Sequence, residues 1–393
     1  MELFHYLQPP KKNWIAYPGI PNQQSLGGEV DFFDGTEGWF QRAKIDVAIL
    51  GVPEGRNSDF KDSENVPSEV RRWLYGMRNV SSDVRIADLG DVLGNTLNDR
   101  YQALGDVVSA LVRENIQVLL IGGSQDLSLP ASRFVSNYPG KYNIAVFDTF
   151  LDVDVLSQDF SASSFIPKLV EDLGESLEEI SFLGNQLYYC SKEQEEYLRN
   201  HYFPVYRLRQ LRGEKIDQCE VVLRDSTVMS FDMTSVKGEP GPVEGMLMPN
   251  GFSHEEACRI FWYAGASDNL KLAALFNLTS LARGDGNSHS GPLGAQMLWH
   301  FLEGYGARWR DFPFRPLEDY ELKVVYFEEF DENLSFYYNS ENERWWIKVP
   351  DSSCEKIVAC HSDDYRLALE KELPEVWWRY FLKTNESVDL NKR

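Results

Sequence analysis

The sequence predicts an α/β fold with a mainly parallel sheet, followed by a small α+β extension. Short apolar runs of strand length, beginning with Ile45–Leu50, alternate with amphipathic helical patterns. After about Arg310 the sequence pattern changes, and polar turns separate closely spaced apolar runs of strand length. We therefore expect an N-terminal arm over residues 1–44, an α/β core over residues 45–310 and an extension over residues 311–393.

The arm is rich in proline, glycine, asparagine and aromatic residues and shows no sustained periodicity. We expect it to lie over the main body of the protein. Its beginning, Met1–Lys12, contains no apolar stretch and ends in Pro-Pro-Lys-Lys, which is unlike a signal peptide.

The core is expected to alternate buried strands with helices. Its first strand ends at Gly51, and a helical apolar stripe runs from Tyr101 to Leu111. A later helix begins with the capping-box spacing of Ser253 and Glu256. The remaining expected strands are Gln117–Ile121, Ile144–Phe147, Thr227–Phe231 and Leu270–Phe276.

Polar residues follow these strands at their carboxyl ends. Asp148 and Asp232 come directly after two of the strands, and Gly122–Asp126 follows a third. In open α/β sheets, ligand sites lie beyond the carboxyl ends of the strands. We therefore expect Gln125, Asp148 and Asp232 to converge at one edge of the sheet.

The extension is expected to contain strands at Leu322–Phe327, Leu334–Tyr338 and Trp345–Val349 and a helix from about Asp363. Packing alone would account for its aromatic residues, but tryptophan is also enriched in binding hot spots. Adjacent residues of a strand face opposite sides, so we expect at least one tryptophan ring to be exposed in an apolar patch. Such a patch would suit a protein partner or a second copy of the chain. The tryptophans that define this predicted interaction surface are Trp345, Trp346, Trp377 and Trp378.

Composition and charge exclude several classes of function. The net charge of −22 repels nucleic-acid phosphates and anionic lipid headgroups. The longest apolar runs have the length of strands, which excludes a membrane-spanning helix. The five cysteines are widely spaced and form no C-x-x-C pair, as expected for reduced thiols. These features predict a soluble, acidic, cytoplasmic protein that neither binds nucleic acid nor inserts into membranes.

Five segments, in order along residues 45–305, resemble motifs of the ureohydrolase family of arginases, agmatinases and formimidoylglutamases. The resemblance implies a three-layer arginase-like fold. In that family, two manganese ions activate water for hydrolysis of C–N bonds in linear amidines and guanidines. The matching segments are Ile49–Pro53 with Val66–Arg71, Asp88–Val92 (D-L-G-D-V), Ile121–Leu127 (the frame of I-G-G-D-H-S-L), Phe147–Asp152 (D-A-H-x-D) and Ser230–Thr234 (S-F-D-x-D).

The departures from the family pattern fall at the metal ligands. Carried over position by position, the two histidines become Gln125 and Phe150, and the last aspartate becomes Thr234. A phenyl ring has no lone pair for a metal ion, and a bridging hydroxide requires two ions. The segment Leu275–Leu278 also replaces the E-x-N-P acid of the family. The family ligands that remain are Asp148, Asp152 and Asp232.

Three carboxylates without metal ions require compensation, because burying an unpaired charge is costly. The ammonium group of Lys237, which takes the place of another family aspartate, is one candidate. A single Mg²⁺ or Ca²⁺ ion is a second, because hard cations prefer oxygen ligands. Residual manganese and partial exposure to water are the remaining alternatives. The candidate oxygen donors are Gln125, Asp126, Asp148, Asp152, Asp232 and Thr234.

The sequence thus leads to the hypothesis of a ureohydrolase-fold protein that has lost its hydrolase activity and carries no cofactor. It would act as a binding or scaffold component in the cytoplasm. A metal-dependent amidine or guanidine hydrolase, similar to formimidoylglutamase but with a rearranged metal site, is the alternative. A magnesium-dependent enzyme of changed chemistry is a third. Metal content separates the three, because they require no ion, two manganese-class ions or one hard cation.

Overall fold

The computed structural model of the chain forms two compact units, which are described separately. The first unit consists of the chain up to Leu198 together with Phe203–Arg308, and the second begins at Trp309 and also takes Arg199–Tyr202. The residues that the structure describes are 3–57, 65–80, 83–137, 140–154, 160–243, 246–279, 290–328, 331–351 and 356–385.

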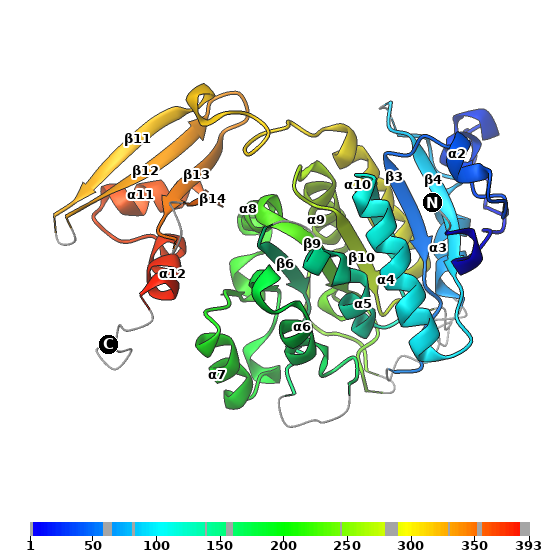
Figure 1. The fold of residues 1–393 in the computed structure, drawn as a ribbon, viewed down its shortest axis with the longest axis horizontal. Helices are drawn as coiled ribbons and strands as arrows, with labels where there is room; N and C mark the ends of the chain where they lie inside the picture. Colours follow the sequence, from blue (N-terminus) through cyan, green and yellow to red (C-terminus); the bar gives the residue numbers. More distant parts are fainter. Residues whose placement is uncertain are drawn as a thin grey trace. The chain divides into compact units, whose positions relative to one another are not determined.

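A ten-stranded sheet forms the centre of the first unit within the described residues (Figure 1). Its strands are β1 (Leu7–Gln8), β2 (Asp31–Phe32), β3 (Val47–Gly51), β4 (Ile86–Val92), β5 (Gln117–Ile121), β6 (Tyr142–Phe147), β7 (Leu177–Leu183), β8 (Val205–Tyr206), β9 (Ser226–Asp232) and β10 (Leu272–Phe276). They follow the order β1-β4-β3-β5-β10-β9-β6-β7-β8, and β2 also pairs with β4. All of these pairs are parallel except β1 with β4, so the predicted mainly parallel sheet is confirmed.

Helices cover both faces of this sheet. They are α1 (Leu26–Glu29), α2 (Trp39–Arg42), α3 (Val66–Leu74), α4 (Leu97–Arg113), α5 (Ser128–Ser132), α6 (Phe165–Leu173), α7 (Lys192–Asn200), α8 (Asp217–Asp225), α9 (His254–Ala266) and α10 (Ser290–Gly306). In β3, Ile49 packs in one hydrophobic cluster with α3, α8, α9 and α10. Its neighbour Leu50 packs in a second cluster with α4, α5 and α6. The unit therefore has three layers, and burial on both faces explains the unbroken apolar runs of its central strands.

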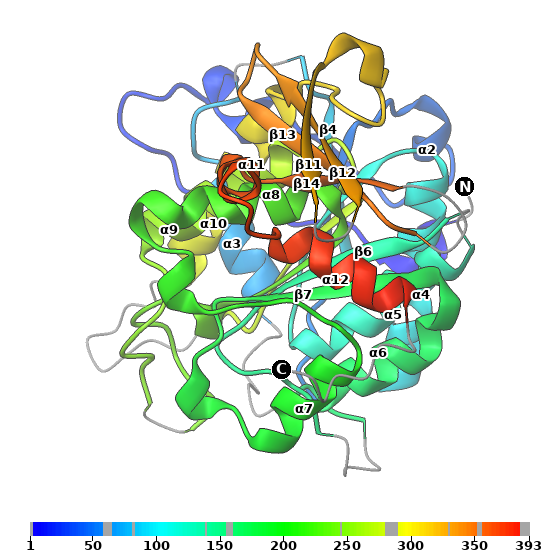
Figure 2. The same cartoon turned by 90° about the vertical axis from the view of Figure 1, so that its left-hand side faces the viewer.

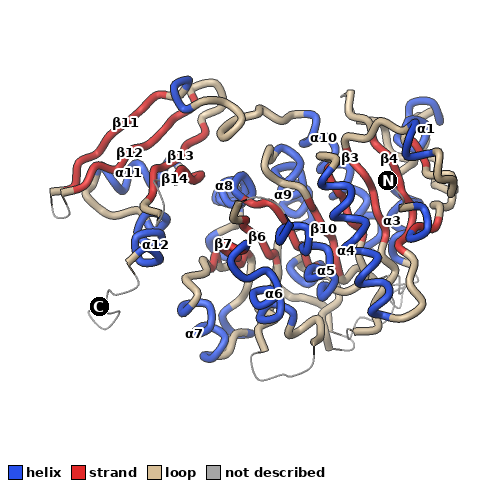
Figure 3. Tube along the Cα trace, in the orientation of Figure 1, coloured by secondary structure: helices blue, strands red, loops and turns tan. Residues whose placement is uncertain are grey.

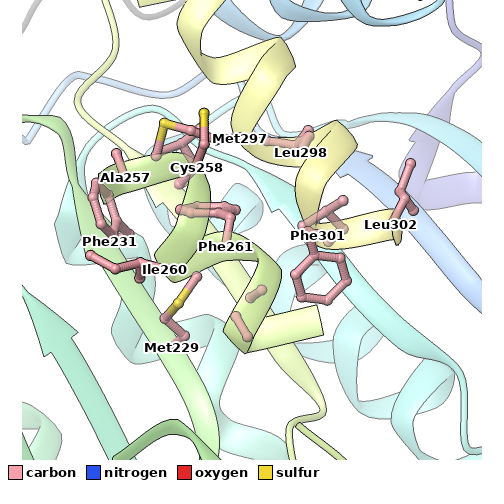
Figure 4. Packing of buried hydrophobic residues seen from close by; sticks show 14 of the residues in the cluster. Met229, Phe231, Ala257, Cys258, Ile260, Phe261, Met297, Leu298, Phe301 and Leu302 are labelled. Carbon is pink, nitrogen blue, oxygen red and sulfur yellow. The ribbon is translucent and has the colours of Figure 1, made fainter. Parts of the chain in front are cut away.

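Helices α9 and α10 pack closely because glycine lines their contact. A Cβ atom at Gly265 would lie 2.0 Å from the carbonyl oxygen of Phe301. A Cβ atom at Gly304 would lie 2.1 Å from the carbonyl oxygen of Trp262. Figure 4 shows the apolar side chains that the two helices bring together with β9, namely Met229, Phe231, Ala257, Cys258, Ile260, Phe261, Met297, Leu298, Phe301 and Leu302.

The second unit is an antiparallel sheet with two helices, as predicted for the α+β extension (Figure 2). Its elements are β11 (Glu321–Phe327), β12 (Glu332–Asn339), β13 (Arg344–Val349), β14 (Lys356–Cys360), α11 (Ser362–Leu369) and α12 (Glu375–Thr384). The strands follow one another in chain order across the sheet (Figure 3). Ile347 and Val349 of β13 pack in one hydrophobic cluster with Trp377 of α12. Among the described helices of both units, none combines the length and apolar character needed to cross a membrane.

A single buried aspartate organises the polar turns of the second unit. The Asp311 carboxylate accepts hydrogen bonds from the Asn339 amide at 2.8 Å, the Asn342 amide at 2.7 Å and the Arg344 guanidinium at 2.8 Å. The Tyr320 hydroxyl donates a further bond at 3.2 Å. Burial alone would raise the pKa of Asp311, but the bonds from Arg344 and the two amides outweigh it and hold the pKa below its usual value. The carboxylate is therefore charged and fully paired.

The four tryptophans of the predicted interaction surface divide into two buried and two half-buried rings. Trp345 stacks on Tyr365 of α11 at 4.9 Å between ring centroids, whereas Trp346 meets Tyr320 edge to face at 5.1 Å. The adjacent rings thus point to opposite sides of β13, yet Trp346 is only 1% exposed because Tyr320 packs against it. In α12, Trp377 is buried and Trp378 is half-buried. Trp345 and Trp378 are partly exposed, so an interaction patch at the tryptophans stays a prediction. The large apolar side chains that this sheet does expose are Leu322, Val324 and Tyr326 of β11.

Candidate functional site

The predicted site residues gather at the carboxyl edge of the first sheet. Strands β5, β10, β9 and β6 are neighbours in that order, so the segments that follow them meet at one place. Gln125 lies in the turn after β5, Asp148 follows β6, and Asp232 ends β9. Asn277 follows β10 directly. The expected convergence of Gln125, Asp148 and Asp232 is confirmed.

The turn after β5 carries Gln125 into this edge. A Cβ atom at Gly123 would lie 1.6 Å from the carbonyl oxygen of Glu54, so only glycine permits this approach of the two loops. Beyond the turn, Gln125 is buried and begins a short 3-10 helix. The family motif at this turn therefore retains its backbone function although its histidine is absent.

The side-chain amide of Gln125 lies among three carboxyl groups. Its nitrogen lies 2.9 Å from Asp152 Oδ2 and 3.1 Å from both Asp148 Oδ2 and Asp232 Oδ2, so its two N–H groups are shared among three acceptors. Its oxygen accepts from the Ser230 hydroxyl at 3.1 Å. The reverse orientation would set the amide oxygen against three carboxyl oxygens, so the neighbours fix the orientation of the amide. A neutral donor thus occupies the centre of the aspartate cluster.

The other partners of the cluster are also neutral. Asp148 Oδ1 accepts from the Thr234 hydroxyl at 2.8 Å and from the Phe150 backbone N–H at 3.0 Å. Asp232 Oδ1 accepts from the Thr234 backbone N–H at 2.7 Å, and the Asn277 amide donates to Asp232 Oδ2. Thr234, which stands in place of a family ligand, therefore acts as a hydrogen-bond donor to two of the carboxyl groups.

Burial and mutual repulsion favour the protonated forms of the three aspartates. Within the described residues, no lysine, arginine or histidine forms an ion pair with Asp148, Asp152 or Asp232. Burial, followed by the charge of Asp152, raises the pKa of Asp148 well above its usual value. Burial and the charge of Asp148 do the same for the pKa of Asp232. Burial raises the pKa of Asp152 to about 7, with smaller contributions from the charges of Asp232 and Asp126.

Lys237 does not compensate this cluster, contrary to one of the expectations from the sequence. Its side chain is exposed, and its backbone N–H donates to the Phe252 carbonyl at 2.9 Å. The short 3-10 helix at Met233–Ser235 turns the chain away from the carboxyl edge before Lys237 is reached. The proposal of a lysine ammonium in place of the metal charge is therefore wrong.

Asp126 belongs to a separate polar pair. Its Oδ2 accepts from the Tyr101 hydroxyl, and the Asn57 amide donates to that hydroxyl at 3.2 Å. Burial raises the pKa of Asp126, although the bond from Tyr101 opposes the shift. Asp126 is therefore paired with Tyr101 of α4, whereas the three aspartates of the cluster surround the Gln125 amide.

A pocket of about 580 Å³ opens onto the cluster. The ring of Phe150 lines it and packs against Tyr189, with 4.9 Å between ring centroids. Asp152 and Asn277 also line it, and both have left-handed backbone conformations, with φ of 48° and 56°. Such strain is costly outside glycine and concentrates at functional sites. The full lining is Arg56, Asn57, Asp148, Phe150, Leu151, Asp152, Ser161, Ala162, Ser163, Tyr189, Gln194, Asp232, Thr234, Pro242 and Asn277.

These residues do not fit a pair of manganese ions. An amide nitrogen has no lone pair to give to a metal, and the Gln125 nitrogen faces all three carboxyl groups. The phenyl ring of Phe150 offers no ligand atom. In the part of the chain that the structure describes, no group of three or more His, Cys, Asp or Glu residues has the arrangement of a metal site. The donor set instead suits hydrogen bonding.

Sequence reasoning missed several pocket residues. Asn277 directly follows a strand, as Asp148 does. The rule that ligand sites lie beyond the carboxyl ends of parallel strands would therefore have identified it. Its Oδ1 is buried and has no hydrogen-bond partner among the described residues. Arg56 and Ser161 lie in loops, and Gln194 lies in α7, away from the strand ends on which the prediction of the site was based.

Comparisons with known proteins agree with this architecture. The model of the Arginase family matches residues 45–299. The formimidoylglutamase of Bacillus subtilis has a TM-score of 0.63 at 17% identity, over 75% of this chain and 95% of its own. The formiminoglutamase of Trypanosoma cruzi, in a crystal structure with Mn²⁺₂, has a TM-score of 0.61 at 21% identity, over 67% of this chain and 94% of its own.

The agmatine ureohydrolase of Thermoplasma volcanium is similar at a TM-score of 0.53 and 17% identity, over 66% of this chain and 89% of its own. No curated protein matches the sequence. The structural likenesses establish the shared fold, and the family match covers most of the first unit. The chain therefore belongs to the arginase family.

Proposed function

We propose that this protein has the ureohydrolase fold without dinuclear manganese hydrolysis, and that it acts as a binding or scaffold component in the cytoplasm. One observation carries the proposal. The Gln125 amide nitrogen donates into the space between Asp148, Asp152 and Asp232. At this position the family has a histidine, whose imidazole is a metal ligand. Here a metal ion between the carboxylates would instead face a hydrogen-bond donor.

The protonation of the cluster supports the same conclusion. Metal ligation requires ionised carboxylates, whereas burial raises the pKa of all three aspartates here. A cation would have to displace these protons and also turn the Gln125 amide away. Even then, Phe150 and Thr234 leave the second ion without its family ligands. Water activated between two ions is therefore not expected.

The pocket supports a binding role. A volume of about 580 Å³ is sufficient for a small molecule, and three aspartates and Asn277 lie on its wall. The left-handed conformations of Asp152 and Asn277 are retained although the hydrolytic ligands are absent. Strained conformations persist where the surrounding structure holds them, and their presence in the pocket favours a ligand site over an empty remnant.

A second candidate is a formimidoylglutamase-like hydrolase with a rearranged metal site. The observation that favours it is the survival of three family carboxylates on one pocket wall. With the Gln125 amide turned, oxygen atoms of Gln125, Asp148 and Asp232 could hold a single Mg²⁺ or Ca²⁺ ion. We therefore keep one hard cation as the alternative to a protein without cofactor.

We also propose that the second unit supplies the contact with a protein partner or a second copy. The net charge of −22 disfavours nucleic acid and anionic membranes as partners. The exposed large apolar side chains of this unit include three on β11 and, outside this strand, Trp309, Phe314 and Leu369.

The test combines metal analysis with activity assays. After incubation with excess Mn²⁺, Mg²⁺ or Ca²⁺ and removal of free ions, elemental analysis should find no bound ion at stoichiometric level. Arginine, agmatine and formimidoylglutamate should release no urea, formamide or ammonia above background. Two tightly bound manganese ions with turnover would overturn the proposal, and one Mg²⁺ or Ca²⁺ ion would favour the alternative.

The matched variant restores the family ligands. The combined change Gln125→His, Phe150→His and Thr234→Asp should create manganese binding, because each replacement supplies a donor atom at the cluster. The conservative combination Gln125→Asn, Phe150→Tyr and Thr234→Ser is the control and should remain free of manganese. Equal manganese content in both variants would show that the substituted positions do not decide metal binding.

A further inference from the structure

Strand β11 is an edge of the second sheet and exposes an apolar row. It pairs with β12 along its whole length and with no other strand of the described residues. On one face of β11, Leu322 is 57% exposed, Val324 53% and Tyr326 45%. An edge strand with unpaired backbone groups and exposed apolar side chains is a template for pairing with another strand.

One hydrogen bond shows which backbone groups face the open edge. Lys371 Nζ donates to the Tyr326 carbonyl oxygen at 2.8 Å, so that carbonyl points away from β12. The N–H and C=O groups of a strand residue point to one side, and those of the next residue point to the other. The same three residues that expose their side chains, Leu322, Val324 and Tyr326, therefore also present their backbone groups to the open edge.

The occupant of this edge follows from its symmetry. In an antiparallel pair of two β11 strands centred on Val324, Val324 lies opposite its own copy and Leu322 lies opposite Tyr326. Each of these pairs is apolar, and each can exchange both backbone hydrogen bonds. On the other face Lys323 lies opposite Val325, so no like charges meet. A strand of another protein would need its own apolar residues at these three positions. A second copy of the chain has them, and a two-fold axis through Val324 brings them into register.

We propose that β11 pairs with β11 of a second copy of this chain, antiparallel about Val324, to form one continuous sheet across the two copies. Lys371 regulates this contact, because its ammonium group already occupies the Tyr326 carbonyl oxygen that the partner's Leu322 N–H requires. Lysine at an edge opposes pairing. The association is therefore reversible and depends on concentration. It does not rest on the function of the pocket in the first unit.

The test uses sedimentation equilibrium of the full chain over a range of micromolar concentrations. The wild type should associate to a dimer. Val324→Lys should weaken association about tenfold or more, because it places two ammonium groups opposite each other. Lys371→Met should strengthen it several-fold, because it releases the carbonyl while keeping the length of the side chain. Phe314→Lys, at an exposed residue of the same unit outside β11, is the control and should associate like the wild type.

Circular dichroism and melting temperatures confirm that each variant is folded. Val324 is exposed, so its replacement should leave the melting temperature of the monomer nearly unchanged. A monomeric wild type together with a monomeric Lys371→Met variant would overturn the proposal and leave the edge to a strand of another protein. Dimerisation that is equal in the wild type, Val324→Lys and Lys371→Met would place the dimer contact elsewhere and also overturn it.

Discussion

Two buried groups of carboxylates, one in each unit, are stabilised in opposite ways. In the second unit, Asp311 accepts bonds from a guanidinium and two amides, and its pKa lies below the usual value. In the first unit, Asp148, Asp152 and Asp232 surround one neutral amide, and the pKa of each is raised. A paired, ionised carboxylate serves the fold by linking turns, whereas a protonated cluster beside a pocket has donors and acceptors to offer a ligand.

The largest expected effect concerns the paired carboxylate. Arg344→Ala leaves Asp311 buried without its cation, and we expect the second unit to lose about 3–5 kcal/mol of unfolding free energy. Urea denaturation followed by tryptophan fluorescence measures the change. The double variant Arg344→Ala with Asp311→Asn should recover part of the loss, because the charge is then removed as well. If Arg344→Ala lost no more unfolding free energy than the removal of an exposed ion pair costs, Asp311 would not depend on its cation. The contrast with the aspartate cluster of the first unit would then fail.

The next effect concerns the amide at the centre of the cluster. Gln125→Glu adds a fourth carboxyl group, and we expect a loss of about 3 kcal/mol at pH 8 and a smaller loss at pH 5. The added carboxyl group remains protonated at the lower pH. Gln125→Met removes the donor without adding a charge, and its cost should be about 1–2 kcal/mol at both values of pH. Equal effects of the two variants at pH 8 would show that charge does not limit the cluster.

The third prediction uses pH to separate the two regions. Because the pKa of Asp152 is about 7 in the folded protein, the folded state binds more protons than the unfolded state between about pH 4 and pH 7. Its contribution to stability is therefore present below this range and is lost as the pH rises through about 7. The lowered pKa of Asp311 has the opposite sign, with stability lost as the pH falls below the usual carboxyl range.

Unfolding measured against pH in Asp152→Asn tests this assignment. The variant should lose part of the decline of stability between about pH 4 and pH 7, because the pKa values of Asp148 and Asp232 are raised as well. It should keep the loss at acidic pH that Asp311 causes. Asp311→Asn should show the reverse pattern. An unchanged pH profile in Asp152→Asn would show that the proton of the cluster resides on another aspartate.

The smallest expected effect concerns a single neutral hydrogen bond. Thr234→Val removes the hydroxyl that donates to Asp148 at 2.8 Å but keeps the shape of the side chain. We expect a loss of about 1 kcal/mol, as for one buried neutral bond. Thr234→Ser, which keeps the hydroxyl, is the matched control and should cost less. A loss of several kcal/mol in Thr234→Val would mean that Asp148 is ionised.

The sequence was informative where backbone geometry decides the outcome. Strand ends placed Asp148 and Asp232 correctly, and the capping box of Ser253 and Glu256 is present at the start of α9. It failed where side-chain packing decides the outcome. Lys237 is near the site along the chain, but a short 3-10 helix turns it to the surface. The burial of Trp346 depends on Tyr320, a contact for which the sequence carries no periodic signal.

The role of Gln125 shows a further limit. The sequence shows that glutamine stands at the position of a family metal ligand. An amide has both a donor and an acceptor, however, and the sequence does not show which end faces the aspartates. The three carboxyl groups favour the amide nitrogen on their side, whereas the hydroxyl of Ser230 pairs with either end of the amide. The amide oxygen of Gln125 could serve as a ligand for a hard cation, whereas its amide nitrogen takes the place of such a cation. The neighbouring side chains in the structure are needed to distinguish these two roles.

The order of strands in the first sheet also has a consequence for synthesis. Strand β10 is the last of the sheet along the chain, yet it lies at the centre, between β5 and β9. While the ribosome is still producing residues before Leu272, the strands on either side, β5 and β9, each lack the neighbour that later pairs with their backbone groups. We expect this half-built sheet to be the species that chaperones bind, and a stalled chain that ends before β10 to aggregate.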